Sequence, residues 1–335
     1  MGQESAPRLT NSLLLAGALG GQNEQDHLRL RRAFLRGYTP QRAAALTVRA
    51  ETIMAELLAA AGANGRADYV SEVARPFSVL VLCELLGIPA SDRFKIASWV
   101  DTLLADTTGD SADPSVYGDA IKELGYYVVQ LVKDRRRTPG PDLVSALAHD
   151  TGELNTREIA TVVFAVVMGG FETTTHMLGK MVLRLLTERR LWNSLRDNPA
   201  LVPDAVEELL RMISVAGGEG IPWMAREHVT LSGVELAPGD YVVPAVGAAN
   251  RDPAIFADPE ETRFDRTGKP HLTLGYGAHF CLGSQIARME LATGLRALIS
   301  TYPATELAVA PADVAWRTGS SVWQLEELPL RFLTH

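Results

Sequence analysis

A single cysteine framed by glycines is the feature of this sequence best suited to chemistry. Cys281 lies in the run LGYGAHFCLG, residues 274–283, and a long amphipathic segment follows it. A thiol at the start of a helix meets free backbone N–H groups and the positive end of the helix dipole, which both favour the thiolate. Gly275 and Gly277 permit a tight turn before the sulfur, and Gly283 leaves room for a flat group against the backbone. The pattern predicts a metal-binding thiolate rather than a buried structural cysteine.

A second group of reactive side chains lies inside a predicted helix. Residues 157–186 carry apolar side chains at three- and four-residue spacing, and the run Gly169-Gly170-Phe171-Glu172-Thr173-Thr174 sits in their middle. Two glycines and a Glu-Thr-Thr sequence destabilise a buried helix, so they need a reason. A close helix crossing would explain the glycines, but it would not explain a carboxylate beside two hydroxyls.

The cysteine run resembles the cysteine loop of the cytochrome P450 family of haem-thiolate monooxygenases, whose usual form is Phe-Gly-x-Gly-x-His-x-Cys-x-Gly. This chain departs from that form at Leu274, which stands where the family usually has Phe. The resemblance implies heme b (iron protoporphyrin IX) as cofactor, with Cys281 as the metal ligand. By the same match, Leu274, Gly275, His279 and Gly283 contact the cofactor.

The glycine-rich run of the central helix resembles the motif with which the same family forms an oxygen-binding groove at a kink. The match places Gly169 and Gly170 at the groove. It makes Glu172 the proton-delivery acid and Thr173 the alcohol that steadies bound dioxygen.

Glu208 and Arg211, three residues apart, share one face of a predicted helix. Alone, they would be read as an exposed ion pair. The sequence resembles the family's Glu-x-x-Arg, however, and residues 250–265 resemble the meander that follows it. The resemblance therefore implies a buried structural cluster of Glu208, Arg211 and Arg263.

His27 and Arg31 are four residues apart on another predicted helix, which is rich in arginine. A basic surface helix would explain most of these arginines. The resemblance assigns His27 and Arg31, together with His279, to the haem propionates, where charged donors would meet carboxylates.

A further propionate contact is altered in this chain. Residues 223–229 resemble a family stretch in which an arginine holds a propionate, but Trp223 occupies that position. An indole N–H can donate one hydrogen bond but carries no charge. Arg226 is the expected substitute.

Composition excludes several classes of protein. The chain has 335 residues, of which 47% are apolar, and its net charge of -8 argues against nucleic acid as a partner. Its two cysteines exclude a disulfide framework and a four-cysteine iron–sulfur cluster. The most apolar N-terminal stretch, residues 13–19, is too short to span a bilayer. We expect a cytoplasmic protein that binds no membrane.

The predicted elements indicate a mainly α fold with a small β region. We expect one cytochrome P450 domain over residues 1–335, in which 23–332 match the family and 1–22 have no assigned match. Few residues precede the His27 helix. The resemblance to the family therefore also implies that this chain lacks the family's first helix and first sheet strands. Helical periodicity covers residues 42–61, 70–86, 92–104, 117–136, 157–186, 202–212 and 286–302, and β-prone pieces lie at 229–231 and 241–243.

The resemblance implies a monooxygenase that oxidises a small-to-medium, largely apolar substrate of secondary metabolism, either free or carrier-bound. No flavin, dinucleotide or iron–sulfur segment is seen, so electrons would come from a ferredoxin-type donor and its reductase. Two alternatives stay open: oxidative coupling or crosslinking of a natural-product scaffold without oxygen insertion, and a non-catalytic haem-binding or partner-docking protein. Family position gives the following pocket residues: Val166, Ala216, Ile221, Ala245, Val246 and Val322.

Overall fold

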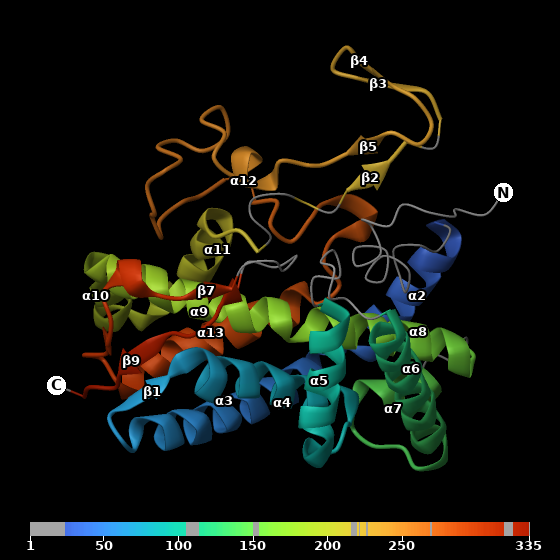
Figure 1. Cartoon of the computed structure of the whole chain (residues 1–335), viewed down its shortest axis with the longest axis horizontal. Helices are drawn as coiled ribbons and strands as arrows, with labels where there is room; N and C mark the ends of the chain where they lie inside the picture. The colour runs from blue at the N-terminus through green and yellow to red at the C-terminus, as the bar shows by residue number, and fades with distance from the viewer. Residues whose placement is uncertain are drawn as a thin grey trace.

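The computed structural model describes residues 24–104, 114–149, 154–215, 220, 222–225, 227–268, 270–317 and 324–334. Helices dominate this part of the chain (Figure 1). The α-helices are α2 (Glu24–Gly37), α3 (Pro40–Gly62), α4 (Arg75–Leu86), α5 (Arg93–Leu104), α6 (Pro114–Arg137), α7 (Leu143–His149), α8 (Thr156–Gly170), α9 (Glu172–Thr187), α10 (Arg189–Asp197), α11 (Val202–Met212), α12 (Val246–Ala249) and α13 (Ser284–Thr301). A π-helical turn, Val70–Ala74, leads into α4.

The strands are short and form small antiparallel sheets. They are β1 (Arg66–Asp68), β2 (Trp223–Met224), β3 (Val229–Leu231), β4 (Val234–Leu236), β5 (Tyr241–Val242), β6 (Glu306–Leu307), β7 (Trp316–Arg317), β8 (Gln324–Leu325) and β9 (Pro329–Arg331). One sheet has the order β1-β9-β6, and the other pairs are β2-β5, β3-β4 and β7-β8. The expected mainly helical fold with a small β region is confirmed.

Local sequence explains where several of these elements begin and end. Thr39 caps α3 by accepting a hydrogen bond from the N–H of Arg42, and Pro40 fills the first helical turn, where no amide donor is needed. Asn155 and Glu158 form a reciprocal capping box at the start of α8. In the β3–β4 hairpin, Ser232 and Gly233 both have positive φ, which matches the twist of a two-residue turn.

The helices α3, α9 and α11 pack against α13, so the helix that follows the cysteine run lies in the core. Gly294 of α13 permits this close approach, because a Cβ there would come within 2.8 Å of Leu178. The segment Thr156–Thr187, which spans α8 and α9, is long and apolar enough to cross a membrane, but 61% of its most apolar window is buried inside the protein. Its hydrophobicity is that of a core helix.

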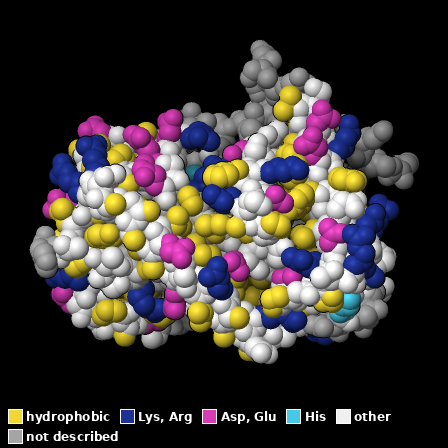
Figure 2. All heavy atoms as spheres, turned by 90° about the horizontal axis from the view of Figure 1, so that it is seen from below, with side chains coloured by type: hydrophobic (Ala, Val, Ile, Leu, Met, Phe, Trp, Pro, Cys, Tyr) yellow, Lys and Arg dark blue, Asp and Glu magenta, His cyan; other side chains and the backbone are white. Residues whose placement is uncertain are grey.

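The surface carries both signs of charge. Seen from below, basic and acidic side chains alternate with apolar ones, and no field of a single sign covers this face (Figure 2). The β3–β4 hairpin extends away from the helical body (Figure 1), and the side chains of Val229, Leu231 and Val234 are exposed on it.

Candidate active site

The cysteine run forms a tight turn that presents Cys281 just before α13. Gly275 and Gly277 adopt φ angles of 79° and 73°, in the left-handed region, and form the tight turn expected from the sequence. The N–H of Cys281 donates to the carbonyl of Leu274 at 2.7 Å, which closes the loop. Gly283 is the N-cap of α13. The thiol therefore stands beside the N-terminus of the helix, as predicted.

In the protein chain by itself, opposing effects act on the Cys281 thiol. Burial raises the pKa of the Cys281 thiol above its ordinary value. The N–H of Gly283 and the charges of Arg31 and Arg288 act in the opposite direction, but they do not outweigh burial. A bound metal would have to deprotonate this thiol, as metals do with cysteine ligands.

The second cysteine differs in its surroundings. Cys83 is 2% exposed in α4, and burial raises the pKa of its thiol to about 12. Such a thiol is inert, so Cys83 is a core residue.

The predicted central helix is broken at Phe171, whose φ and ψ of -127° and -41° separate α8 from α9. The Thr173 hydroxyl donates to the carbonyl of Gly169 at 2.9 Å, across the break. A Cβ on Gly170 would lie 2.9 Å from Leu82 of α4, whereas a Cβ on Gly169 would meet nothing within 4 Å. The two glycines thus have different tasks: Gly170 allows helix packing, and Gly169 keeps space open at the kink.

Glu172 is buried in a charged network that sequence reasoning missed. His176, one turn later in α9, places Nε2 2.9 Å from Glu172 Oε2. Arg75, at the start of α4, lies 3.5 Å from the other carboxylate oxygen and also pairs with Asp101 of α5 at 2.5 Å. The spacing of Glu172 and His176 could have revealed their contact. The partners on α4 and α5 depend on the tertiary fold and leave no local signal.

The two carboxyl groups of this network have pKa values shifted in opposite directions. Burial acts to raise the pKa of Glu172, but the hydrogen bond from His176 and the charge of Arg75 outweigh it, so the pKa is lowered. Burial raises the pKa of Asp101, only partly offset by Arg75, and the nearby Glu172 raises it further. Paired carboxyl groups with diverging pKa values are typical of sites that hold and move protons.

Residues assigned to the propionates converge from three parts of the chain. The rings of His27 and His279 stack at a centroid distance of 4.1 Å, and the Trp223 indole meets His279 edge-on at 5.5 Å. Burial, followed by the charges of His279 and Arg31, lowers the pKa of His27. Its Nδ1 is buried and finds no protein partner among the described residues. Arg226 lies outside the described residues.

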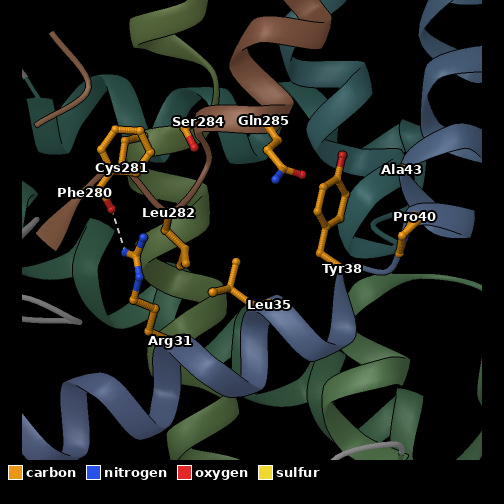
Figure 3. A pocket seen from close by; sticks show the side chains of 10 residues that line it. All are labelled: Arg31, Leu35, Tyr38, Pro40, Ala43, Phe280, Cys281, Leu282, Ser284 and Gln285. Atoms are coloured by element: carbon orange, nitrogen blue, oxygen red, sulfur yellow. Dashed lines mark hydrogen bonds between the residues drawn. The ribbon is translucent and has the colours of Figure 1, made fainter. Parts of the chain in front are cut away.

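Arg31 points toward the cysteine loop. Its guanidinium donates to the carbonyl of Phe280 at 2.6 Å, beside a hollow of about 560 Å³ between α2 and the start of α13 (Figure 3). Leu35 of α2, Tyr38 just after that helix and Cys281 line the same hollow. Since the side chain of Leu35 is 49% exposed, the hollow has an apolar rim that is open to solvent.

The structural cluster around Glu208 forms, but with a different third arginine. Arg211 binds the buried carboxylate through two hydrogen bonds of 2.8 Å. Arg266 donates its Nε at 2.9 Å. The predicted Arg263 contributes only its backbone N–H, and its guanidinium pairs with exposed Asp265. The assignment of the Arg263 side chain was wrong, because the path of residues 258–266, rather than residue spacing, decides which arginine reaches Glu208.

Three of the six predicted pocket residues lie in the described part of the chain. Val166 is half-buried in α8, and Val246 is half-buried at the start of α12 beside exposed Ala245. Val166, Gly169 and Thr173 follow one another at helical spacing, so they form a partly uncovered stripe along the kinked helix. The remaining pocket predictions, Ala216, Ile221 and Val322, lie outside the described residues.

The profile of the family "Cytochrome P450" matches residues 117–311. Nocardicin C N-oxygenase of Nocardia uniformis subsp. tsuyamanensis is 37% identical over 98% of this chain and 83% of its own length. The chain belongs to the cytochrome P450 family. It is a heme-containing monooxygenase by that membership, with a fold shared by solved P450 structures.

Two of these solved P450 structures inform the function. The structure of P450BioI in complex with a hexadec-9Z-enoic acid ligated acyl carrier protein has a TM-score of 0.87 and 29% identity. The match covers 99% of this chain and 86% of that one. Cytochrome P450mel 107F1, described as having biaryl coupling reactivity, has a TM-score of 0.83 and 37% identity, with 90% and 76% covered.

The residues of this P450 fit a haem. A Cβ on Gly169 or Gly283 would meet nothing within 4 Å, so both glycines keep backbone surface open for a flat group. The orphan Nδ1 of buried His27 suits a propionate oxygen. Cys281 offers the soft sulfur ligand that haem iron accepts.

Proposed function

We propose that this P450 inserts one oxygen atom into a C–H or aromatic group of a largely apolar natural product. The single observation that carries the proposal is the kinked helix, in which an open glycine and a hydroxyl, Gly169 and Thr173, lie beside a carboxylate with a proton-transfer network. Apolar or small side chains at Val166, Ala245 and Val246 favour an apolar substrate. Two relatives, nocardicin C N-oxygenase and 6-deoxyerythronolide B hydroxylase, carry the names of natural products, which supports a natural product as the class of substrate.

Cys281 would bind the haem iron through its sulfur, and His27, Arg31, Trp223 and His279 would contact the propionates. When bound, the haem supplies the activation of dioxygen: two electrons and two protons are taken up, one oxygen atom enters the substrate and the other leaves as water. The N–H of Gly283 and the charge of Arg31 stabilise the sulfur as an anion. Leu274 keeps the loop apolar where the family usually has an aromatic ring.

Proton delivery is proposed to start at Asp101. Its side chain is 47% exposed, whereas the side chain of Glu172 is 4% exposed, so the pair connects solvent with the interior. Asp101 holds a proton at a higher pH than an ordinary aspartate, and Arg75 bridges it to Glu172. His176 fixes the orientation of the inner carboxylate. Thr173 would position the proton acceptor at the kink.

The second candidate function is oxidative coupling of two aromatic groups without oxygen insertion. It is favoured by the 37% identity to P450mel 107F1, described by its biaryl coupling reactivity. A carrier-bound substrate is compatible with either reaction, since a P450BioI structure contains an acyl carrier protein. A non-catalytic role has no comparable support in the described residues, because the groups proposed for catalysis, Glu172, Thr173 and Cys281, are all present.

The experiment is a ligand screen followed by product analysis. Ferric protein is screened for compounds that shift its spectrum, and the best ligand is incubated with isotopically labelled dioxygen and a ferredoxin-type donor system. One labelled oxygen atom in the product is the expected result. A joined product without label would establish coupling, and a ligand that is bound yet never oxidised while electrons are supplied would contradict both reactions.

A further inference from the structure

A buried lysine on the kinked helix has no part in the function proposed so far. Lys180 of α9 is 5% exposed. Its Nζ donates to the backbone carbonyl of Ser214 at 2.9 Å and lies 3.4 Å from that of Val215, just after the end of α11. No acidic side chain pairs with the lysine among the described residues, and burial lowers its pKa to about 8.

A buried ammonium group without a carboxylate partner needs a reason. Removing a cation from water costs free energy, and an apolar side chain of similar length would pack in the helix without that cost. A lysine offers three N–H donors and no acceptor, and here the donors meet two carbonyls of another segment. The position of Lys180 is therefore explained by the two carbonyls that it binds rather than by the packing of α9.

Lys180 connects these carbonyls with the active-site side of the helix. Thr173 and Lys180 both belong to α9 and are seven residues apart, which is about two helical turns and about 10 Å, so they lie on the same side of it. Ser214 and Val215 are therefore held against the side of α9 that carries the Thr173 hydroxyl.

The chain that leaves α11 also reaches the cysteine loop. The N–H of Gly220 donates to the carbonyl of Pro244 at 2.7 Å, and a Cβ on Gly220 would come within 3.0 Å of Val246. Further along, the Trp223 indole meets the His279 ring. This length of chain thus contacts both parts of the protein to which the proposed function assigns oxygen activation and haem binding.

We infer that Lys180 is a positioning residue for the substrate: by holding Ser214 and Val215, it fixes one wall of the pocket and thereby the size of molecule that fits at the kink. The inference rests on the proposed function, in which the substrate lies between α9 and the haem. Val215 is half-buried and apolar, which suits contact with an apolar substrate.

Two azoles of different size separate this role from a purely structural one. Imidazole binds ferric haem iron through a ring nitrogen and needs little room, whereas 4-phenylimidazole must also fit its phenyl ring against the pocket wall. Lys180→Met keeps the length of the side chain but removes the N–H donors. It should weaken the binding of 4-phenylimidazole on the order of tenfold, because the wall loses its hydrogen bonds from a charged donor, and leave the binding of imidazole unchanged.

Spectral titration of the haem-loaded ferric protein measures both affinities, and the carbonyl spectrum of each reduced variant shows whether the thiolate ligand is intact. Lys180→Arg keeps a charged donor and should stay close to the unsubstituted protein. Lys133→Met, at an exposed lysine of α6, is the matched control. If Lys180→Met does not fold, Lys180→Gln replaces it, since its shorter side chain cannot reach both carbonyls and the same selective loss is expected.

The outcomes separate the two proposals. A selective loss of 4-phenylimidazole binding in Lys180→Met that is absent in Lys180→Arg supports the positioning role. Equal changes for both azoles, a change no larger than that of Lys133→Met, or the same loss in Lys180→Arg overturns it and leaves the proposed function standing. Failure of both Lys180→Met and Lys180→Gln to fold would make Lys180 a structural residue and overturn it as well. A carbonyl spectrum without the thiolate band in the unsubstituted protein would overturn the proposed function itself.

Discussion

Arg263 and Arg266 bind different groups, and substitution of each can measure how much its side chain contributes to stability. Arg266 supplies a guanidinium to buried Glu208, whereas Arg263 supplies only its backbone N–H. Arg266→Ala should lower the free energy of unfolding by about 3 kcal/mol, because it leaves a buried carboxylate with fewer partners. Arg263→Ala should change it little, because its side chain pairs at the surface with Asp265. Denaturant unfolding of both variants measures this, and a larger loss in Arg263→Ala would contradict the cluster.

His176 provides a second test, through the pH dependence of stability. The pKa of Glu172 is lowered in the folded protein, so its ionised form adds stability above the ordinary glutamate pKa, and this stability is lost as the pH falls through the folded-state pKa. His176→Ala should lower stability at neutral pH by about 1.5–3 kcal/mol and flatten its decline between neutral and acidic pH. His149→Ala, at an exposed histidine of α7, is the control. An unchanged slope in His176→Ala would show that the contact does not hold the carboxylate.

Sequence could predict those residues whose role depends on their neighbours in the chain. The turn before Cys281 follows from glycines with positive φ, and the Glu208–Arg211 pair follows from helical spacing. Long-range partners were not predictable: Arg75 meets Glu172 only because α4 packs against the kink. The burial that raises the pKa of the Cys281 thiol likewise depends on the whole fold.

At the scale of elements, the break between α8 and α9 controls how the active site is built. The periodicity of residues 157–186 predicted one helix, and the interruption at Phe171 appears where the two glycines weaken it. Helix ends were predictable within a few residues where caps and prolines are present, as in α3 and α8. The predicted β-prone pieces at 229–231 and 241–243 appear as β3 and β5, but their pairing was harder to predict, since β5 pairs with β2 across the intervening hairpin.

The two glycines at the break should respond differently to the same substitution. Gly170→Ala places a methyl group against buried Leu82 and should lower the melting temperature, at a cost of about 1 kcal/mol. Gly169→Ala enters open space, so it should keep the melting temperature but reduce turnover by narrowing the groove. Melting curves and product formation together check the pair. Equal destabilisation by both substitutions would mean that Gly169 is a packing residue as well.

At the scale of the whole molecule, an acidic protein presents basic residues on α2. The net charge is -8, yet Arg31 and exposed Arg32 lie on the helix that borders the hollow beside Cys281. We propose this side as the docking face for an acidic, ferredoxin-type donor. Arg32→Glu should slow reduction and weaken its dependence on salt, because electrostatic steering is screened over about 8–10 Å.

Arg66→Glu reverses the same charge on β1, directly opposite Arg331 in the sheet, and serves as the control. Stopped-flow reduction at several salt concentrations compares the two variants. If both variants behave alike, the donor docks elsewhere.

The central claim is that Cys281 binds haem iron as a thiolate, and the carbonyl complex of the reduced protein tests it most directly. The unsubstituted protein should show the red-shifted absorption band typical of thiolate ligation. Cys281→Ala should abolish this band, and Cys83→Ala, at the buried cysteine of α4, should leave it unchanged. A normal band in Cys281→Ala would contradict the account.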